Sequence, residues 1–206
     1  MIEMVPAWVD GVLTPVEKLD AHQRGLRHLA VSVFVMNGPR TLLQRRALGK
    51  YHTPGLWANT CCTHPRWDEE AATCAVRRLR EELGITGLYP NYAGRVEYRA
   101  DVGGGLVEHE LVDIFVAEAG PNLTLQLNPD EVAATRWVDL YDLSAEVLRT
   151  ASRNSGRMKR RLKGVKPLCT LSVSTVSVCT VVTLSMMQRG VGKVLFIAQP
   201  PARHRV

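Results

Sequence analysis

Acidic residues are absent from the last part of this 206-residue chain, because no Asp or Glu follows Glu146. Residues 147–206 carry twelve of the 26 Lys and Arg, so residues 1–146 hold 14 basic against 20 acidic side chains. The net charge of +6 therefore belongs to the C-terminal stretch, and the preceding part is acidic. Nucleic-acid-binding domains cluster positive charge, whereas the part of this chain that could fold into a domain is acidic. We therefore expect no nucleic-acid partner.

Regular cysteine spacing is also missing. With 46% hydrophobic and 22% charged residues, a chain of this length can bury a core without a disulfide scaffold. No charged-then-apolar leader opens the chain at Met1. We therefore expect a reducing, cytoplasmic setting. The cysteines are an odd number, namely Cys61, Cys62, Cys74, Cys169 and Cys179.

A strongly apolar run is missing too. Residues 167–188 form an uncharged stretch of 22 residues, but eight of these are Ser or Thr, which makes insertion into a membrane unfavourable. We expect no membrane partner. Composition divides the chain into a globular domain, residues 1–146, and a basic, then Ser/Thr/Val-rich tail, residues 147–206. This tail is either a disordered segment, a genuine C-terminal sequence of unusual composition, or the product of a shifted reading frame.

One strong helix is expected from Asp68, as its N-cap, to Gly84, which ends it. Its apolar positions recur at helical spacing: Ala72, Val76, Leu79 and Leu83. A weaker helix is expected over residues 139–148. Runs of β-branched and aromatic residues between turn residues predict strands at 28–35, 41–44, 58–63, 94–100, 106–119 and 135–138. This pattern favours an α/β or α+β sandwich, with mixed sheets flanked by helices.

Two residue pairs carry groups that bind metals or protons. Cys62 with His64, and Glu108 with Glu110, are spaced i, i+2, and such residues project from one face of an extended segment. Together with His22 and His28 they suit Mn, Zn or Fe as a divalent transition ion. The alternative is the polar face of an edge strand with scattered histidines, and spacing alone does not decide between the two.

The expected helix carries a more specific pattern. It resembles the Nudix box, in which a helix gathers glutamates around a diphosphate-bound magnesium ion. Thr63 replaces the first glycine of that pattern, and Arg78 replaces one glutamate. Because Arg78 removes negative charge from the magnesium site, the pattern argues against a hydrolase. A solvated helix face with Arg78 and Glu82 paired at i, i+4 is the alternative. The matching residues are Glu69, Arg77, Leu79, Glu81, Glu82, Gly84 and Ile85.

Six further segments stand out along the chain: Arg45-Arg-Ala-Leu-x-Lys50, Pro54-Gly-Leu-Trp-Ala-Asn-Thr60, Cys62-Thr-His-Pro65, Tyr98-Arg-Ala100, Glu108-His-Glu110 and Asn128-Pro-Asp-Glu-Val132. In the same order, over roughly residues 15 to 145, they resemble the type I isopentenyl-diphosphate isomerase family. The resemblance implies a Nudix-type sandwich and conversion of isopentenyl diphosphate, a small molecule, into dimethylallyl diphosphate for isoprenoid synthesis.

The resemblance also implies roles for individual residues. The transition-metal ligands would be His22, His28, His64, Glu108 and Glu110. The catalytic group would be Cys62, Glu110 and Tyr98. A Mg²⁺ ion arriving with the substrate would bind Glu82 and the backbone carbonyl of Cys62, while Mn²⁺ or another divalent metal would occupy the histidine site. The diphosphate would be bound by Arg46, Lys50 and Arg78.

Two other functions remain open from the sequence. One is a Nudix hydrolase of a nucleoside diphosphate, and the other is a non-enzymatic protein whose basic tail binds an anionic partner. One departure from the isomerase family is that no tryptophan follows Trp137, although the family closes its site with a C-terminal Pro-Trp segment. The sequence does not indicate the oligomeric state.

Overall fold

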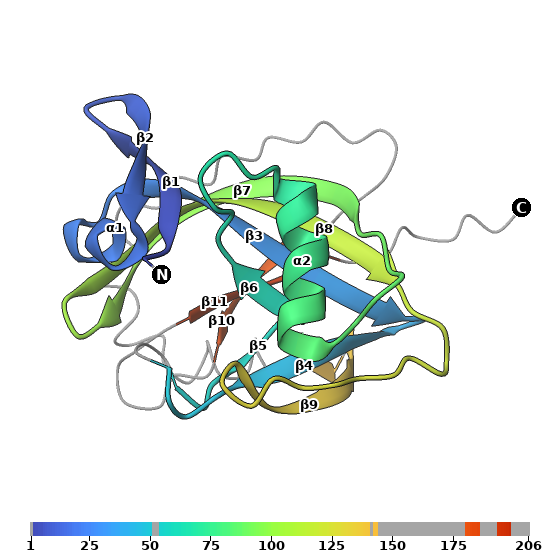
Figure 1. The fold of residues 1–206 in the computed structure, drawn as a ribbon. Coiled ribbons are helices and arrows are strands. Elements are labelled where there is room, and N and C mark those ends of the chain that lie inside the picture. Colours follow the sequence, from blue (N-terminus) through green and yellow to red (C-terminus); the bar gives the residue numbers. More distant parts are fainter. Residues whose placement is uncertain (1, 51–53, 141, 144–179, 186–192, 199–206) are drawn as a thin grey trace, which may run out of the picture.

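The computed structural model describes residues 2–50, 54–140, 142–143, 180–185 and 193–198 (Figure 1). Nine of its strands form one mixed sheet, and two more form a separate antiparallel hairpin. The elements are β1 Met4–Val9, β2 Val12–Glu17, α1 Lys18–Arg24, β3 Arg27–Asn37, β4 Arg40–Arg46, β5 Trp57–Ala58, β6 Cys61–Thr63, α2 Ala71–Leu83, β7 Asn91–Gly103, β8 Leu106–Glu118, β9 Val132–Asp139, β10 Thr180–Ser185 and β11 Lys193–Ala198.

Strand β3 is the centre of the sheet. It pairs in parallel with β8 over residues 27–36 and antiparallel with β6 over residues 31–33, so it lies between these two strands. Residues of β3 are buried on both faces, which explains its nearly continuous hydrophobic sequence. On the far side of β8, the long hairpin partner β7 is joined through a turn at Gly104 and Gly105, whose positive φ angles suit glycine.

The two faces of β3 support two separate hydrophobic cores. Val31, Val33 and Val35 belong to the core on which α2 packs, and α2 lies across this face of the sheet in Figure 1. Phe34 and Met36 belong to a second core on the opposite face. Since successive side chains of a strand alternate between faces, odd-numbered and even-numbered positions of β3 serve different layers.

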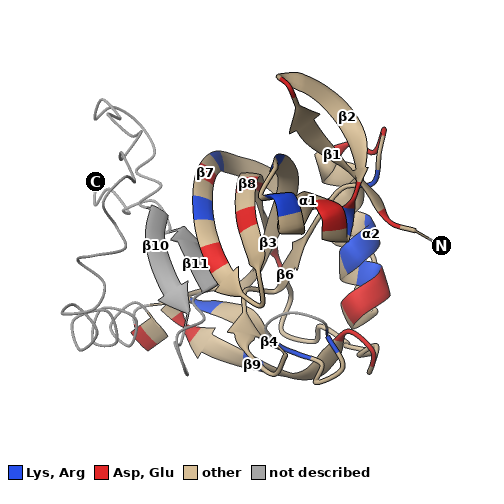
Figure 2. Ribbon diagram, turned by 90° about the vertical axis from the view of Figure 1, so that its left-hand side faces the viewer, with Lys and Arg blue, Asp and Glu red and all other residues tan. Residues whose placement is uncertain are grey.

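Helix α2 confirms the expected helix and its end, because Gly84 adopts the left-handed conformation with φ 65°. Two details of that expectation are wrong. Asp68 does not cap the helix, which begins at Ala71 after Glu70. Of the expected apolar positions, Leu79 and Leu83 are buried, but Ala72 and Val76 are exposed, and Cys74 and Ala75 complete the buried face in their place. Figure 2 shows that the remaining surface of α2 carries both signs of charge.

The N-terminal hairpin β1–β2 and the helix α1 were not expected from the sequence. They form a small core of their own around Val5, Ala7, Val16 and Ala21. Strand β1 contacts β3 through the register pair Ala7 and His28. The hairpin thereby brings α1 to the end of β3 at which His28 lies.

The expected sandwich of a mixed sheet with helices is confirmed. The expected strands correspond to β3, β4, β5 with β6, β7, β8 and β9. The weaker helix expected over 139–148 lies largely outside the described residues, which omit 141 and 144–148. Of the tail, the structure describes only β10 and β11. Among the residues that the structure describes, neither helix is long and apolar enough to span a bilayer.

Candidate active site

Three buried histidine rings converge at one end of β3. His22 comes from α1, His28 from β3, and His64 from the residue directly after β6, and their ring centroids lie 4.7 to 5.2 Å apart. The carboxylate of Glu110 in β8 completes the group, whose candidate ligand atoms all lie within 4.8 Å of one another. The structure thus brings together four of the five residues expected to bind a transition metal.

Strand register explains why these side chains meet. His28 and Glu110 are partners in the parallel β3–β8 pair, and Ser32 and Cys62 are partners in the β3–β6 pair. Partners in register share a face, and residues 28 and 32 lie on the same face of β3. Cys62 and Glu110 therefore lie on one face of the sheet, from strands on either side of β3.

Backbone carbonyls orient two of the rings. His22 Nδ1 lies 2.7 Å from the carbonyl oxygen of Lys18, and His28 Nδ1 lies 2.8 Å from that of Leu26. Because a carbonyl only accepts, each Nδ1 carries the proton and donates it. In a neutral ring the Nε2 lone pair then remains for a ligand, as is typical of metal-binding histidines. Burial lowers the pKa of His28, but Glu110 outweighs burial and raises this pKa, so an ion bound at that ring would replace a proton.

Burial and charge set the protonation of this cluster. Burial holds the pKa of His64 well below its usual value, and burial followed by the charge of His28 lowers that of His22. Burial alone raises the pKa of Glu110, but His28 and His64 outweigh it and hold this pKa well below the usual value. Two neutral imidazoles and a carboxylate form a set of donors that fits a divalent metal.

One atom of the cluster supports this fit. The buried Nε2 of His28 has no hydrogen-bond partner within bonding distance among the described residues, and it lies 3.7 Å from Glu110 Oε1. Nε2 of His64 lies closer to that oxygen, at 3.2 Å. Buried polar atoms are rarely left without a hydrogen bond, so a bound ion is a natural partner here.

Tyr98 connects the two glutamates of β8. Its hydroxyl lies 2.7 Å from Glu110 Oε2 and 3.0 Å from Glu108 Oε2, and because it has one proton it donates to one carboxylate at a time. Burial, and then the charges of Glu110 and Glu108, raise the pKa of Tyr98 well above its usual value, so it stays protonated. Glu108 is buried beside the metal-binding group without belonging to it.

The thiol of Cys62 is half-buried and donates a hydrogen bond to Oδ1 of Asn59. Asn59 is itself buried, and its Nδ2 lies 2.5 Å from Ser32 Oγ and 3.1 Å from the carbonyl oxygen of Cys61. Because the carbonyl can only accept, the amide nitrogen must face it, and the amide oxygen must face Cys62. Asn59 therefore orients the thiol.

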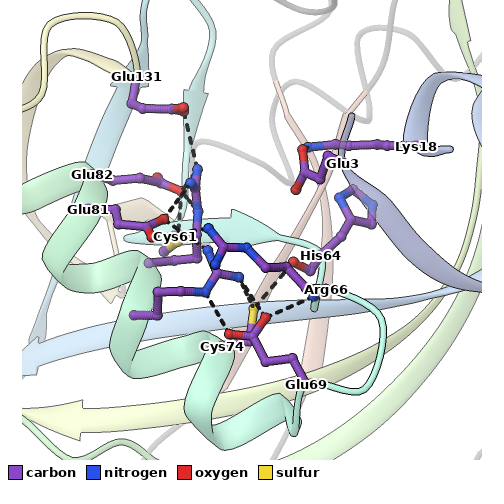
Figure 3. A network of polar contacts seen from close by, with 12 residues as sticks. Glu3, Lys18, Cys61, His64, Arg66, Glu69, Cys74, Glu81, Glu82 and Glu131 are labelled. Atoms are coloured by element: carbon purple, nitrogen blue, oxygen red, sulfur yellow. Dashed lines mark hydrogen bonds and ion pairs between the residues drawn. The ribbon is translucent and has the colours of Figure 1, made fainter. Parts of the chain in front are cut away.

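A second polar cluster surrounds the buried Glu82 on the α2 side of the sheet (Figure 3). Its Oε2 accepts a hydrogen bond from Gln44 at 2.8 Å, and its Oε1 accepts from Arg78 at 2.9 Å and from Cys61 at 3.2 Å. The pairing of Arg78 with Glu82 is thus present, but not on a solvated helix face, because Glu82 is buried. Cys61 and Cys62 face opposite layers, so β6 links this cluster to the histidine cluster.

The three expected diphosphate-binding residues lie near this second cluster. Arg78 contacts Glu81, Glu82 and Glu131 through ion pairs. Lys50 forms an ion pair with Glu131 as well. Arg46 is buried at the end of β4, next to a bulge in its pairing with β9. Two of the three cations therefore share one carboxylate.

Sequence reasoning missed four polar residues that hold the expected site residues. Gln44 and Cys61 carried no pattern that points to Glu82, because this partner is 38 and 21 positions away in the sequence. Asn59 lies in the Pro54–Thr60 segment that resembles the family, but that resemblance gave it no role. Glu131 lies in the Asn128–Val132 motif that we had matched to the family without giving it a role. Its place in that motif was the signal available, since its basic partners Lys50 and Arg78 are distant in the sequence.

Comparisons with known proteins agree on one family. The NUDIX domain family model matches residues 26–162. A protein of Dinoroseobacter shibae named isopentenyl-diphosphate Delta-isomerase is 71% identical over 153 residues, which cover 74% of this chain and 87% of that protein. One of the same name from Cereibacter sphaeroides is 75% identical over 147 residues, covering 71% and 83%.

Solved structures agree on the fold. DR0079 from Deinococcus radiodurans matches with a TM-score of 0.57 at 17% identity, covering 77% of this chain and 98% of that one. At this identity the likeness concerns the fold alone. Identity above 70% over most of the relatives' length is the stronger finding, and by it the chain belongs to the isopentenyl-diphosphate Delta-isomerase family, built on a NUDIX domain.

Proposed function

We propose that this enzyme interconverts isopentenyl diphosphate and dimethylallyl diphosphate. Its relatives carry the name of that activity at 71% and 75% identity. The observation that carries the proposal within the structure is the placement of Cys62 and Glu110 on one face of the sheet, on either side of β3. A thiol and a carboxylate facing one space are suited to moving protons at two carbons of a small substrate.

The reaction transfers two protons. An unactivated alkene is a weak base, so one held acid must protonate it, and a base must remove a proton at another carbon. The intermediate is a tertiary carbocation. We assign the two proton transfers to Cys62 and Glu110, with Tyr98 donating to the carboxylate at 2.7 Å. Glu110 is buried and Tyr98 is partly buried, which limits access of the water that would capture the cation.

The histidine cluster is our proposed site for Mn²⁺ or another divalent transition metal, held by His22, His28, His64 and Glu110, with Glu108 nearby. When bound, such an ion supplies positive charge that fixes the Glu110 carboxylate and neutralises the cluster. The chain's own contribution is to orient the rings through the Lys18 and Leu26 carbonyls.

The diphosphate does not react and provides binding energy for orienting the small hydrocarbon. We assign its binding to Arg46, Lys50 and Arg78. Glu82 fits a magnesium ion that arrives with the substrate, since a carboxylate oxygen is a ligand that Mg²⁺ prefers, and the Cys62 carbonyl is the second proposed ligand. Gln44 and Arg78 hold the Glu82 carboxylate in place.

Turnover of isopentenyl diphosphate by the purified full-length chain tests this proposal. With magnesium and manganese present, we expect the allylic isomer to form and no phosphate to be released. Cys62→Ala and Glu110→Gln should each reduce turnover about a hundredfold to ten-thousandfold, since acid–base catalysis supplies about 10²- to 10⁴-fold per group. Glu118→Gln, at an exposed position of the same strand, is the matched control.

Two outcomes would contradict the proposal. Activity that survives both substitutions would remove the assigned proton carriers. Phosphate release from nucleoside diphosphates without isomerisation would favour the hydrolase function instead.

A further inference from the structure

The Asn128–Val132 motif forms a turn that joins two elements of the second cluster. The backbone N–H of Asn128 donates to the carbonyl of Glu82 at 2.9 Å, and the N–H of Ala47 donates to the carbonyl of Glu131 at 2.9 Å. Within the turn, the side chain of Asn128 accepts from the N–H of Asp130 at 3.1 Å. The turn is therefore anchored both to the end of α2 and to the end of β4.

The same turn places one carboxylate between two cations. Oε2 of Glu131 contacts Nζ of Lys50 and lies 3.3 Å from NH2 of Arg78. The side chains are 22%, 22% and 18% exposed, in the order Glu131, Lys50, Arg78. Figure 3 shows Glu131 reaching toward the helix that carries Glu82. The two cations come from separate segments, after β4 and within α2, and meet at a single oxygen atom.

The carboxylate of Glu131 offsets the repulsion between Lys50 and Arg78. Two positive groups that converge from different elements repel each other, and the repulsion grows as burial lowers the effective dielectric. A carboxylate between them offsets this repulsion and keeps the flexible lysine side chain in one place. Burial raises the pKa of Glu131, but the hydrogen bond from Lys50 and the charge of Arg78 outweigh it, so the group stays ionised.

We propose that Glu131 is a positioning residue that holds Lys50 and Arg78 together as a preformed binding site for the substrate's diphosphate. This inference rests on the proposed function. It deepens that function by assigning the Asn128–Val132 turn a role in substrate affinity. Glu131 acts through the two cations and does not itself contact the reacting carbons. Its loss should therefore weaken binding and leave the chemical step in place.

Steady-state kinetics of Glu131→Gln tests the inference. This variant keeps the shape of the side chain and removes its charge. We expect KM for isopentenyl diphosphate to rise about tenfold, which corresponds to a loss of about 1.4 kcal/mol of binding, while kcat stays within about twofold. Glu131→Asp, which restores the charge on a shorter side chain, should recover part of the loss. Asp130→Asn removes a charge at the neighbouring exposed position and is the matched control.

A double-mutant cycle separates this role from a structural one. If Glu131 acts through Lys50, Glu131→Gln should raise KM less in a Lys50→Met background than in the wild type. An unchanged or lowered KM in Glu131→Gln would overturn the inference, because it would mean that the carboxylate does not help the cations or repels the substrate. If kcat and thermal stability both fall in Glu131→Gln, the inference is also overturned, because this result would indicate that Glu131 is a structural anchor.

Direct binding distinguishes failure of this inference from failure of the proposed function. If the wild type does not isomerise isopentenyl diphosphate, the proposed function fails, and calorimetry with inorganic diphosphate and magnesium still tests Glu131. Binding that is about tenfold weaker in Glu131→Gln than in the wild type supports the positioning role. Equal binding in both proteins contradicts it.

Discussion

The amide oxygen of Asn59 accepts a hydrogen bond from the thiol of Cys62, three residues further along the chain. The amide nitrogen is held by Ser32 Oγ at 2.5 Å and by the Cys61 carbonyl at 3.1 Å. These contacts fix which way the amide faces, and so fix where the thiol points. A residue without any acid or base function of its own thus determines how the proposed proton carrier meets the substrate.

Replacing Asn59 by Leu should lower kcat at least tenfold with KM within about threefold, because the thiol loses its orientation while the diphosphate site is unchanged. The change leaves buried acceptors unpaired, so we expect the free energy of unfolding to fall by about 1 to 3 kcal/mol. Steady-state kinetics and urea unfolding measure the two effects. Ser32→Ala removes one anchor of the amide and should have a smaller effect on kcat. Wild-type kcat in Asn59→Leu would contradict this role.

Tyr98→Phe removes the hydroxyl that lies 2.7 Å from Glu110 and 3.0 Å from Glu108. Two buried carboxylates then lose their shared donor, and we expect kcat to fall roughly tenfold to a hundredfold. Tyr92→Phe, on the same strand and 60% exposed, is the control and should retain wild-type kcat. If both variants turn over equally fast, the hydroxyl has no part in catalysis.

Removal of divalent ions should lower thermal stability. An ion at a hundred times its Kd adds about 2.7 kcal/mol to folding, which for a chain of this size raises Tm by about 5 to 10 °C. We expect a chelator to reverse that rise, and His64→Asn to abolish most of it. His109→Asn changes a histidine that lies outside the cluster and should keep the full response. Scanning calorimetry with and without manganese makes the comparison.

Acid should weaken the anchor of α2 that Glu69 provides. Burial alone raises the pKa of Glu69, but the hydrogen bonds from Arg77 at 2.6 and 2.7 Å outweigh it and hold this pKa below 4.5. A carboxylate with a lowered folded-state pKa stabilises the fold above its unfolded-state pKa, and this contribution disappears as the pH falls through the folded-state pKa.

Glu69→Gln should therefore cost about 1 to 2 kcal/mol at pH 7, and the difference from the wild type should shrink between pH 5 and pH 3. Denaturant unfolding at several pH values measures it. Glu70→Gln, at the exposed neighbouring position, should show little difference at any pH. A gap for Glu69→Gln that stays constant down to pH 3 would show that the lost charge is not its cause.

The sequence predicted the central part of the fold better than its N-terminal part. Strand β3 was evident from its β-branched run, and the end of α2 from Gly84. The hairpin β1–β2 was missed because each strand contains a proline, and these residues, Pro6 and Pro15, are partners in register. Proline is depleted in strands, so its presence conceals them. Helix α1 has seven residues, too few for a helical period to be recognised.

Family resemblance singled out the side chains of the site, and their roles remain proposals. What the sequence could not provide were the contacts that depend on distant pairing. The β3–β8 pair joins residues about eighty positions apart, and Gln44 meets Glu82 across 38 positions. Local patterns carry no information about such partners. The face of α2 was only partly assigned correctly for a related reason, since Ala72 and Val76 are apolar but the sheet contacts the side that bears Ala75 and Leu79.

The alternation of side chains along β3 couples correct folding to activity. Because neighbouring positions of a strand face opposite layers, a shift of one residue between β3 and β8 would turn Glu110 toward the apolar layer under α2 and place His109 or Leu111 opposite His28. A sheet misaligned in this way would bury an unpaired carboxylate and separate it from the histidines, so the register of this one strand pair favours the arrangement of the proposed metal site.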